Sequence, residues 1–186
     1  GASFYYNQTA KNGTKPWRNT GYKFPVTIVT GDLQYKGFNN NLIVRGNAVY
    51  GNLGASGALT TINNSSSAAS GYPNTTVAQN AVSYGGEAGY NIGSFFHSKA
   101  PRIYPFIRYE YYNPMEKTEA NTGLLADKRF QVSAVTAGLN YYALPNLVIK
   151  ADYTHRSIGG GKYNDENLVS VGICLLYTSP SPRDCS

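Results

Sequence analysis

An all-β fold, an antiparallel transmembrane β-barrel, is predicted by two regular features of this sequence. Between Pro25 and Ile173, segments of about ten residues alternate apolar and polar side chains, and the connections between them are alternately long and short. A strand that crosses a bilayer needs about nine to eleven residues and presents every second side chain to lipid. Tight turns at one rim and longer loops at the other are typical of such barrels.

The clearest predicted strand runs from Leu42 to Tyr50, where even-numbered residues are apolar or small and odd-numbered ones include Arg45 and Asn47. A strict period of two cannot be the apolar stripe of a helix. Further strands with this alternation are predicted at residues 82–92, 103–112, 131–141 and 147–153, weaker ones at 29–36 and 168–173, and the end of another at 3–7.

The connections fall into two classes that alternate along the chain. The predicted short ones are residues 37–41, 93–101 and 142–146, and the predicted long ones are 9–24, 52–76, 113–128 and 157–166. This order directs the last strand toward the periplasm. The long segment 52–76 is rich in Ser, Asn, Gly, Ala and Thr, so it is predicted to be a flexible surface loop without a core of its own.

The composition is compatible with this fold. Mean hydropathy is −0.36 and no apolar run approaches 18 residues, which excludes a transmembrane helix. A barrel needs no such run, because only alternate residues face lipid. The chain has 17 Tyr, a residue that prefers the membrane interface. Aromatic girdles near strand ends on the lipid face are predicted from Tyr35, Tyr50, Tyr90, Tyr109, Tyr111, Tyr141 and Tyr153. A soluble β-sandwich is the alternative fold, and the regular loop pattern argues against it.

Both ends of the chain are expected to be cut. Residues 174–186 break the alternation and match one reading frame of a common sequencing adaptor, so we expect an outer-membrane β-barrel fragment over residues 1–173 and a non-native, adaptor-derived tail over 174–186. Cys174 and Cys185 both fall in that tail, so no disulfide is predicted. The chain opens inside an apparent strand without Met or signal peptide. We therefore expect the C-terminal seven to eight strands of a larger barrel.

Three segments resemble the last strands of a known family. They are YPFIRYEYYNP at 104–114, ADYTHR at 151–156 and GKYNDEN at 161–167, and they are similar to Gram-negative outer-membrane porins of the phosphate-selective porin O/P family. The resemblance spans Pro25 to Ile173. It implies the cell outer membrane as the location, a homotrimer, and a constriction lined by Arg and Lys that favours anions. No residue of a phosphate-binding ladder is carried over.

The polar faces of the predicted strands hold the candidate site. If these faces point inward, eight charged residues line a water-filled lumen: Lys36, Arg45, Glu87, Arg108, Glu110, Lys150, Asp152 and Arg156. The three arginines and Lys150 are predicted to attract anions, with the carboxylates as counterweights. The alternative is that these residues form mutual ion pairs inside a closed barrel filled by side chains, and only the width of the lumen separates the two.

The predicted function is therefore that of a porin, through which small hydrophilic solutes and ions diffuse passively, with a possible bias toward anions or phosphate. The alternative is a non-conducting barrel that acts as an adhesin or structural anchor. Expected partners are outer-membrane lipids, including lipopolysaccharide, and small hydrophilic or anionic solutes; no cofactor is expected. The net charge of +6 does not indicate nucleic-acid binding, because the cations form no compact cluster interleaved with exposed aromatics.

Catalysis and metal binding receive little support from the sequence. The only histidines are His97, in a predicted short turn, and His155. His155 lies three residues from Asp152, so on a strand the two side chains point to opposite faces and cannot form a catalytic pair. The run Gly159–Lys162 is predicted to be a hairpin tip. No cluster has metal-ligand spacing, although residues 164–167 offer oxygen ligands that could hold a hard cation weakly.

Overall fold

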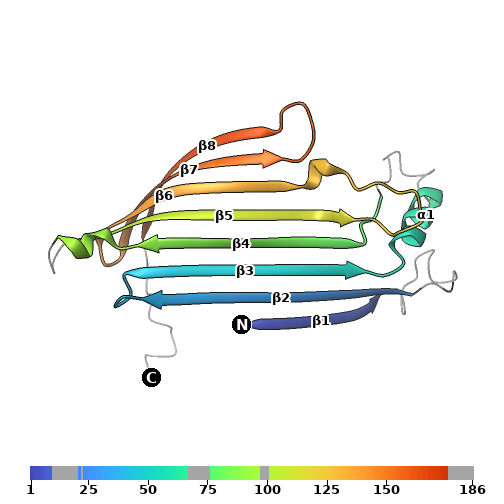
Figure 1. Cartoon of the computed structure of the whole chain (residues 1–186), viewed down its shortest axis with the longest axis horizontal. Coiled ribbons are helices and arrows are strands. Elements are labelled where there is room, and N and C mark those ends of the chain that lie inside the picture. Colours follow the sequence, from blue (N-terminus) through green and yellow to red (C-terminus); the bar gives the residue numbers. More distant parts are fainter. Residues whose placement is uncertain (10–20, 22, 67–75, 97–100, 176–186) are drawn as a thin grey trace, which may run out of the picture.

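The computed structural model describes residues 1–9, 21, 23–66, 76–96 and 101–175 of the chain. These residues form one antiparallel sheet of eight strands, in which each strand pairs with its neighbours in sequence (Figure 1). The all-β antiparallel prediction is thus confirmed. The strands are β1 (Ala2–Thr9), β2 (Phe24–Gly37), β3 (Leu42–Leu53), β4 (Asn80–Tyr90), β5 (Arg102–Lys117), β6 (Val132–Leu144), β7 (Leu147–Ile158) and β8 (Asp165–Leu175).

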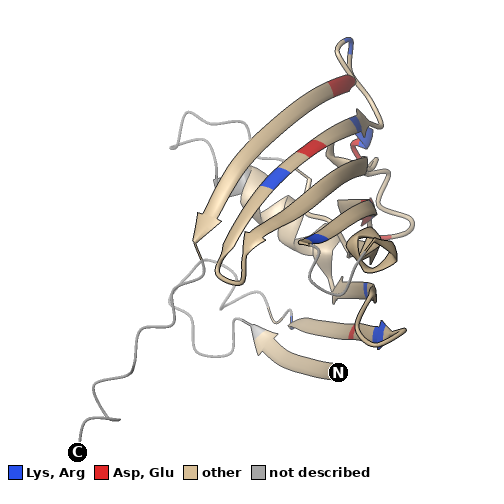
Figure 2. Cartoon of the chain, turned by 90° about the vertical axis from the view of Figure 1, so that its left-hand side faces the viewer, with Lys and Arg blue, Asp and Glu red and all other residues tan. Residues whose placement is uncertain are grey.

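The sheet is curved, and β1 and β8 lie at its opposite margins when it is seen from the ends of the strands (Figure 2). Among the described strands, β1 pairs only with β2 and β8 only with β7. Each margin therefore presents an unpaired edge. The structure agrees with the predicted barrel in strand number, direction and order, and it does not show the sheet closed.

Neither face of the sheet is covered by a second layer in the part of the chain that the structure describes. Only four hydrophobic side chains there are buried: Phe24, Met115, Val132 and Val148. Three of them lie at strand ends and Met115 near the end of β5, so they do not form a central core. A soluble domain of this size would bury a core between packed layers. This sheet instead leaves most of its large apolar side chains exposed.

The connections at one rim are mostly tight, as predicted. In the turn between β2 and β3, Phe38, Asn39 and Asn40 have φ values of 51°, 55° and 66°, and the Asn41 amide donates to the Phe38 carbonyl at 3.0 Å. Asn tolerates this left-handed conformation better than most residues. β6 and β7 are joined through Pro145 and Asn146 alone.

The strict alternation of long and short connections is not kept. Residues 159–164, between β7 and β8, form a shorter connection than residues 91–101, between β4 and β5. The reason is that the ladder continues to Ser157 opposite Asp165, and the Ile158 amide donates to the Asn164 carbonyl at 2.7 Å. The glycine run is a hairpin tip, as predicted, and Gly161 has a φ of 114°.

The connection between β3 and β4 is not the structureless loop that its composition predicts. It contains helix α1 (Ser56–Ser66), in which Ser56 and Thr60 are buried. Ser, Thr and Asn are weak helix formers. A tertiary contact compensates, because the carboxylate Oε2 of Glu119, in the β5–β6 connection, accepts a hydrogen bond from the Gly57 amide at 2.5 Å. No helix in the described ranges is both long and apolar enough to cross a membrane.

A short 3-10 turn, η4 (Lys128–Phe130), precedes β6. The Asp127 carboxylate accepts hydrogen bonds from the Arg129 amide at 2.9 Å and from Arg129 Nε at 2.9 and 3.1 Å. The Arg129 side chain, and then its amide, lower the pKa of Asp127. A carboxyl group whose pKa is lowered by folding stabilises the folded state above its unfolded pKa, and loses that contribution as the pH falls through the folded value.

β8 includes the first two residues of the predicted tail, whose non-native origin stays a prediction. Cys174 pairs with Val148 and Leu175 with Leu147, so the ladder continues two residues past Ile173. The remainder of the predicted tail, residues 176–186, lies outside the described residues.

Candidate functional site

One face of the sheet, called here the apolar face, carries most of the exposed large hydrophobic side chains. Cross-strand partners lie on the same face of a sheet, so the strand register assigns these residues together. More than a third of the surface of each is exposed: Phe4, Tyr6, Val29, Leu33, Tyr35, Tyr50, Tyr84, Ile107, Tyr109, Val135, Leu139, Ile149, Tyr153, Val169, Val171, Ile173 and Leu175. The apolar face extends from one sheet edge to the other.

The tyrosines predicted to form girdles all lie on the apolar face. Two of them, Tyr109 and Tyr153, sit near the middle of their strands instead of near the ends. Several rings pack on one another: Tyr84 and Tyr111 are stacked with centroids 5.0 Å apart, and Tyr90 stacks on Phe95 at 5.5 Å. The Tyr90–Phe95 stack lies at a rim of the apolar face, whereas Tyr84 and Tyr111 lie well inside β4 and β5.

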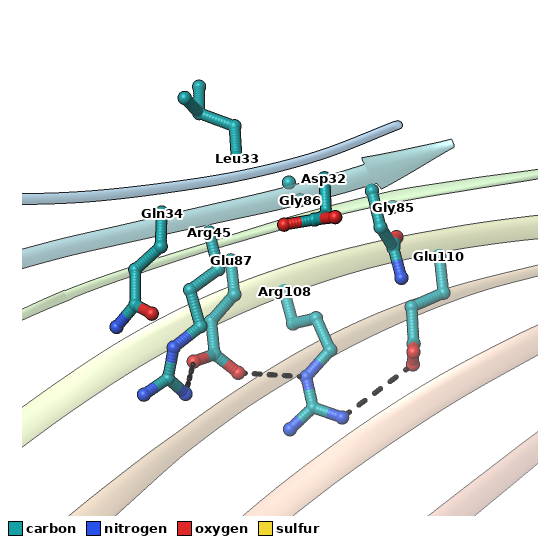
Figure 3. A pocket seen from close by; sticks show the side chains of 11 residues that line it. Asp32, Leu33, Gln34, Arg45, Gly85, Gly86, Glu87, Arg108 and Glu110 are labelled. Carbon is teal, nitrogen blue, oxygen red and sulfur yellow. Dashed lines mark hydrogen bonds and ion pairs between the residues drawn. The ribbon is translucent and has the colours of Figure 1, made fainter. Parts of the chain in front are cut away.

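The opposite face, called the charged face, holds all eight of the predicted site residues, because the register assigns Lys36, Arg45, Glu87, Arg108, Glu110, Lys150, Asp152 and Arg156 to it. Figure 3 shows the separation on β2: Leu33 points away from the side toward which Gln34 and the charged side chains of β3 to β5 project. The alternation read from the sequence therefore sorts charge from apolar surface correctly.

Four of the eight residues form an alternating chain of ion pairs across β3, β4 and β5, called the charge chain (Figure 3). Glu87 is central: its Oε1 lies 3.4 Å from Arg45 Nη1 and its Oε2 lies 3.1 Å from Arg108 Nε. Arg108 Nη1 then reaches Glu110 Oε2 at 3.8 Å. The order follows from the register, in which Arg45 lies opposite Glu87 and Glu87 opposite Arg108.

The charge chain borders a hollow of about 460 Å³ on the charged face, lined by β2 to β5. Asp32 and Gln34 line it from β2, and Asn47 lines it from β3. The Glu87 side chain is only 24% exposed, whereas that of Arg45 is 57% exposed. The arginines therefore present charge to solvent while the carboxylate between them is partly shielded. Such an open, polar hollow suits water and small ions better than a tightly bound ligand.

A separate ion pair joins Arg156 on β7 to Glu166 on β8, which lie directly opposite each other. For Lys36, Lys150 and Asp152, no ion pair is found with any described residue. The structure thus brings together only part of the predicted set. The prediction that these residues line a pore remains a prediction.

Three charged residues of the charged face were missed by the sequence prediction: Asp32, Arg102 and Glu166. Asp32 falls on the polar face of a predicted strand, so alternation alone could have included it. Glu166 was predicted to lie in a loop, because β8 begins directly after a glycine-rich segment and its start could not be recognised from the sequence. Two carboxylates and one cation join the predicted set, and the excess of cations over anions on this face is correspondingly smaller.

The residues considered for catalysis do not form a site in the described ranges. His155 lies on the apolar face with its Nδ1 2.9 Å from Asn167 Oδ1, and Asp152 lies on the charged face, as the spacing predicts. His97 is outside the described residues. β8 begins at Asp165, so Asp165 and Glu166 point to opposite faces. No group of three or more potential metal-ligating His, Cys, Asp or Glu residues occurs in the described ranges.

Comparisons with known proteins give no family for this chain. No protein-family model matches it, and neither a curated protein nor a solved structure does so. The resemblance to phosphate-selective porins therefore stays a prediction from sequence. The function of the chain has to be inferred from the two faces of its sheet.

Proposed function

We propose that this chain belongs to an outer-membrane β-barrel porin of a Gram-negative bacterium, through which small hydrophilic solutes and ions diffuse passively. One observation carries the proposal: a single curved sheet has an exposed apolar face rimmed by tyrosines and an opposite face with the charge chain. Contact with lipid would cover the exposed apolar face, and contact with water would solvate the charged face. No cofactor is needed for such a function.

The apolar face supports contact with lipid. Ile107, in the middle of β5, is 58% exposed, and Val171, in the middle of β8, is 76% exposed. Soluble monomers rarely expose contiguous apolar patches larger than a few hundred Å². In a bilayer the same surface needs no cover, and tyrosine rings near the rims lie where headgroups meet hydrocarbon.

The soluble β-sandwich fits the observations less well. A sandwich buries an inner face against a second sheet, and in the described residues there is one sheet only. If the apolar face were the inner face, an entire second sheet would have to cover it.

Membrane insertion also requires that the sheet closes. An unpaired backbone group in hydrocarbon costs several kcal/mol, so spanning sheets have no open edges. The proposal therefore includes closure of β1 and β8, either with each other or with further strands. The homotrimer and any preference for phosphate rest on the family resemblance alone.

The charged face supports a pore with mixed charge. Neighbouring positive and negative groups in a hollow create a strong local field, which influences ions passing at close range. Lys36 and Lys150, which have no ion pair with described residues, would add a modest attraction for anions. The structure adds two carboxylates but only one cation to the charged face, so we expect the anion preference to be weak.

Conductance in a planar lipid bilayer tests the proposal directly. The complete barrel to which this chain belongs, refolded in detergent, is expected to insert with a large, steady conductance and a reversal potential that is slightly anion-biased in a salt gradient. Arg45→Ala and Arg108→Ala are each expected to reduce the anion bias. Lys162→Ala is the control, since it removes an exposed cation at the β7–β8 hairpin tip, outside the charged face.

No conductance from the complete barrel, folded and inserted in the membrane, would contradict the porin proposal. The function would then be the alternative, a barrel that acts as an adhesin or anchor, with its interior charges paired only with one another. Conductance with an unchanged reversal potential in both arginine variants would show instead that the charge chain does not face the ion path.

A further inference from the structure

A furrow on the apolar face lies close to the rim that carries α1. It is a cavity of about 260 Å³ across β2, β3 and β4. Gly31 and Ala48, which lie opposite each other, form a floor of small residues, and Val29, Tyr50, Val82 and Tyr84 rise around it. A Cβ atom added at Gly31 would meet no heavy atom within 4 Å, so the floor is open.

The walls of the furrow are fixed by contacts outside it. The Tyr50 hydroxyl is hydrogen-bonded to the side-chain amide of Asn80, which is buried. Tyr84 is stacked on Tyr111 with ring centroids 5.0 Å apart. Rings that are held in this way do not collapse into the furrow, so its shape is available before any ligand binds. A preformed, narrow apolar groove suits one flexible hydrocarbon chain.

Cations at the adjacent rim indicate the kind of head group; the neighbouring anion, Glu116, accepts hydrogen bonds from the Tyr111 hydroxyl and the Asn113 side-chain amide. Lys117, the last residue of β5, lies opposite Asn80 and is exposed. Lys23, just before β2, is also exposed at this rim. Cations next to a membrane interface attract anionic lipid head groups. The tyrosine hydroxyl and Asn80 mark the level at which head groups and hydrocarbon meet.

We propose that the furrow is a binding site for one acyl chain of an anionic lipid, whose head group is held near Lys23 and Lys117. This inference rests on the proposed function, because it requires the apolar face to lie in a bilayer. It goes further by naming a lipid class and a position on the sheet. The rest of the apolar face then contacts lipid without such a preference.

Paramagnetic broadening of valine methyl signals tests the proposal. The full chain is placed in phosphatidylcholine nanodiscs with a minor amount of phosphatidylglycerol that carries a nitroxide on its acyl chain. We expect the Val82 methyls, in the furrow, to be broadened several-fold more than those of Val135, elsewhere on the apolar face. The excess is expected to shrink when labelled phosphatidylcholine replaces the phosphatidylglycerol, and also in Lys23→Gln.

Two substitutions fill the furrow, and one serves as a matched control. Ala48→Leu and Gly31→Val are each expected to abolish the excess broadening at Val82, and Gly31→Val serves if Ala48→Leu does not fold. Ala137→Leu makes the same change at an exposed position of the apolar face outside the furrow, and is expected to keep the excess.

The remaining outcomes separate this inference from the proposed function. Equal broadening at Val82 and Val135, unaffected by Ala48→Leu, would overturn the furrow site and leave membrane insertion intact. Absence of broadening at both valines would overturn membrane insertion and the furrow site with it. Protection of Val82 alone would overturn the lipid site, because a protein surface, such as a second copy of the chain, would then cover the furrow.

Discussion

Ile107→Lys is expected to destabilise the membrane-inserted chain by about 2–4 kcal/mol, which is the cost of a lysine on the lipid face of a barrel near the bilayer midplane. Ile107 lies in the middle of β5 on the apolar face and is 58% exposed. In a soluble protein, a lysine at such an exposed position would be nearly neutral. The sign and size of the effect therefore report on the solvent that this face meets.

Asn47→Lys is the matched control for that substitution. Asn47 is an exposed residue of the central strand β3, on the charged face opposite Asp32, so a lysine there gains a carboxylate neighbour. The two variants are folded into lipid vesicles and compared by denaturant titration. The folded fraction is measured from the different migration of the folded and unfolded chain in gels whose samples are not heated. Equal stability of Ile107→Lys and the parent chain would contradict the assignment of the apolar face to lipid.

Glu87→Gln is expected to produce the largest shift in ion preference of any single substitution on the charged face. Glu87 is the carboxylate shared by Arg45 and Arg108, at 3.4 and 3.1 Å, and its neutralisation leaves both guanidinium groups without their common partner. The field in the hollow becomes more positive, so the reversal potential should move clearly toward anions. Because the arginines are partly exposed, we expect a loss of stability of only about 1 kcal/mol.

Asp127→Asn provides the control for Glu87→Gln. It removes one carboxylate that is paired with an arginine, Arg129, in the η4 turn outside the strands. Its reversal potential is expected to stay near that of the parent chain. If both variants shift the reversal potential equally, the effect reflects overall charge and not the charge chain, and the pore-lining assignment of Glu87 would be wrong.

The sequence predicted the strands and their faces because alternation is a local signal. In β3 and β4, consecutive side chains reveal their faces without any knowledge of the neighbouring strand. One boundary differed from the prediction: β5 continues to Lys117, beyond the predicted end at Tyr112, because residues 113–117, with the sequence Asn-Pro-Met-Glu-Lys, carry no alternation. Whether the sheet closes depends on edges that no local pattern describes.

The remaining features depend on contacts between residues far apart in the sequence. The order of charges in the charge chain follows from the register of β3, β4 and β5, which the face of each strand alone does not give. Helix α1 forms in a segment of weak helix propensity, because its first turn is bonded to Glu119, 62 residues away from Gly57. Composition alone predicted a loop there, and tertiary structure overrode it.

The most direct test of the two-faced sheet is the reaction of single cysteines with a membrane-impermeant thiol reagent in lipid vesicles. Asn47 and Ala48, and likewise Ser170 and Val171, are neighbours on opposite faces, and all four are exposed. Each is replaced by cysteine in a Cys174→Ser, Cys185→Ser background. Asn47→Cys and Ser170→Cys are expected to react, and Ala48→Cys and Val171→Cys to react only after the vesicles are dissolved and the chain is denatured. Reaction of all four in intact vesicles would contradict the central claim that one face meets lipid and the other meets water.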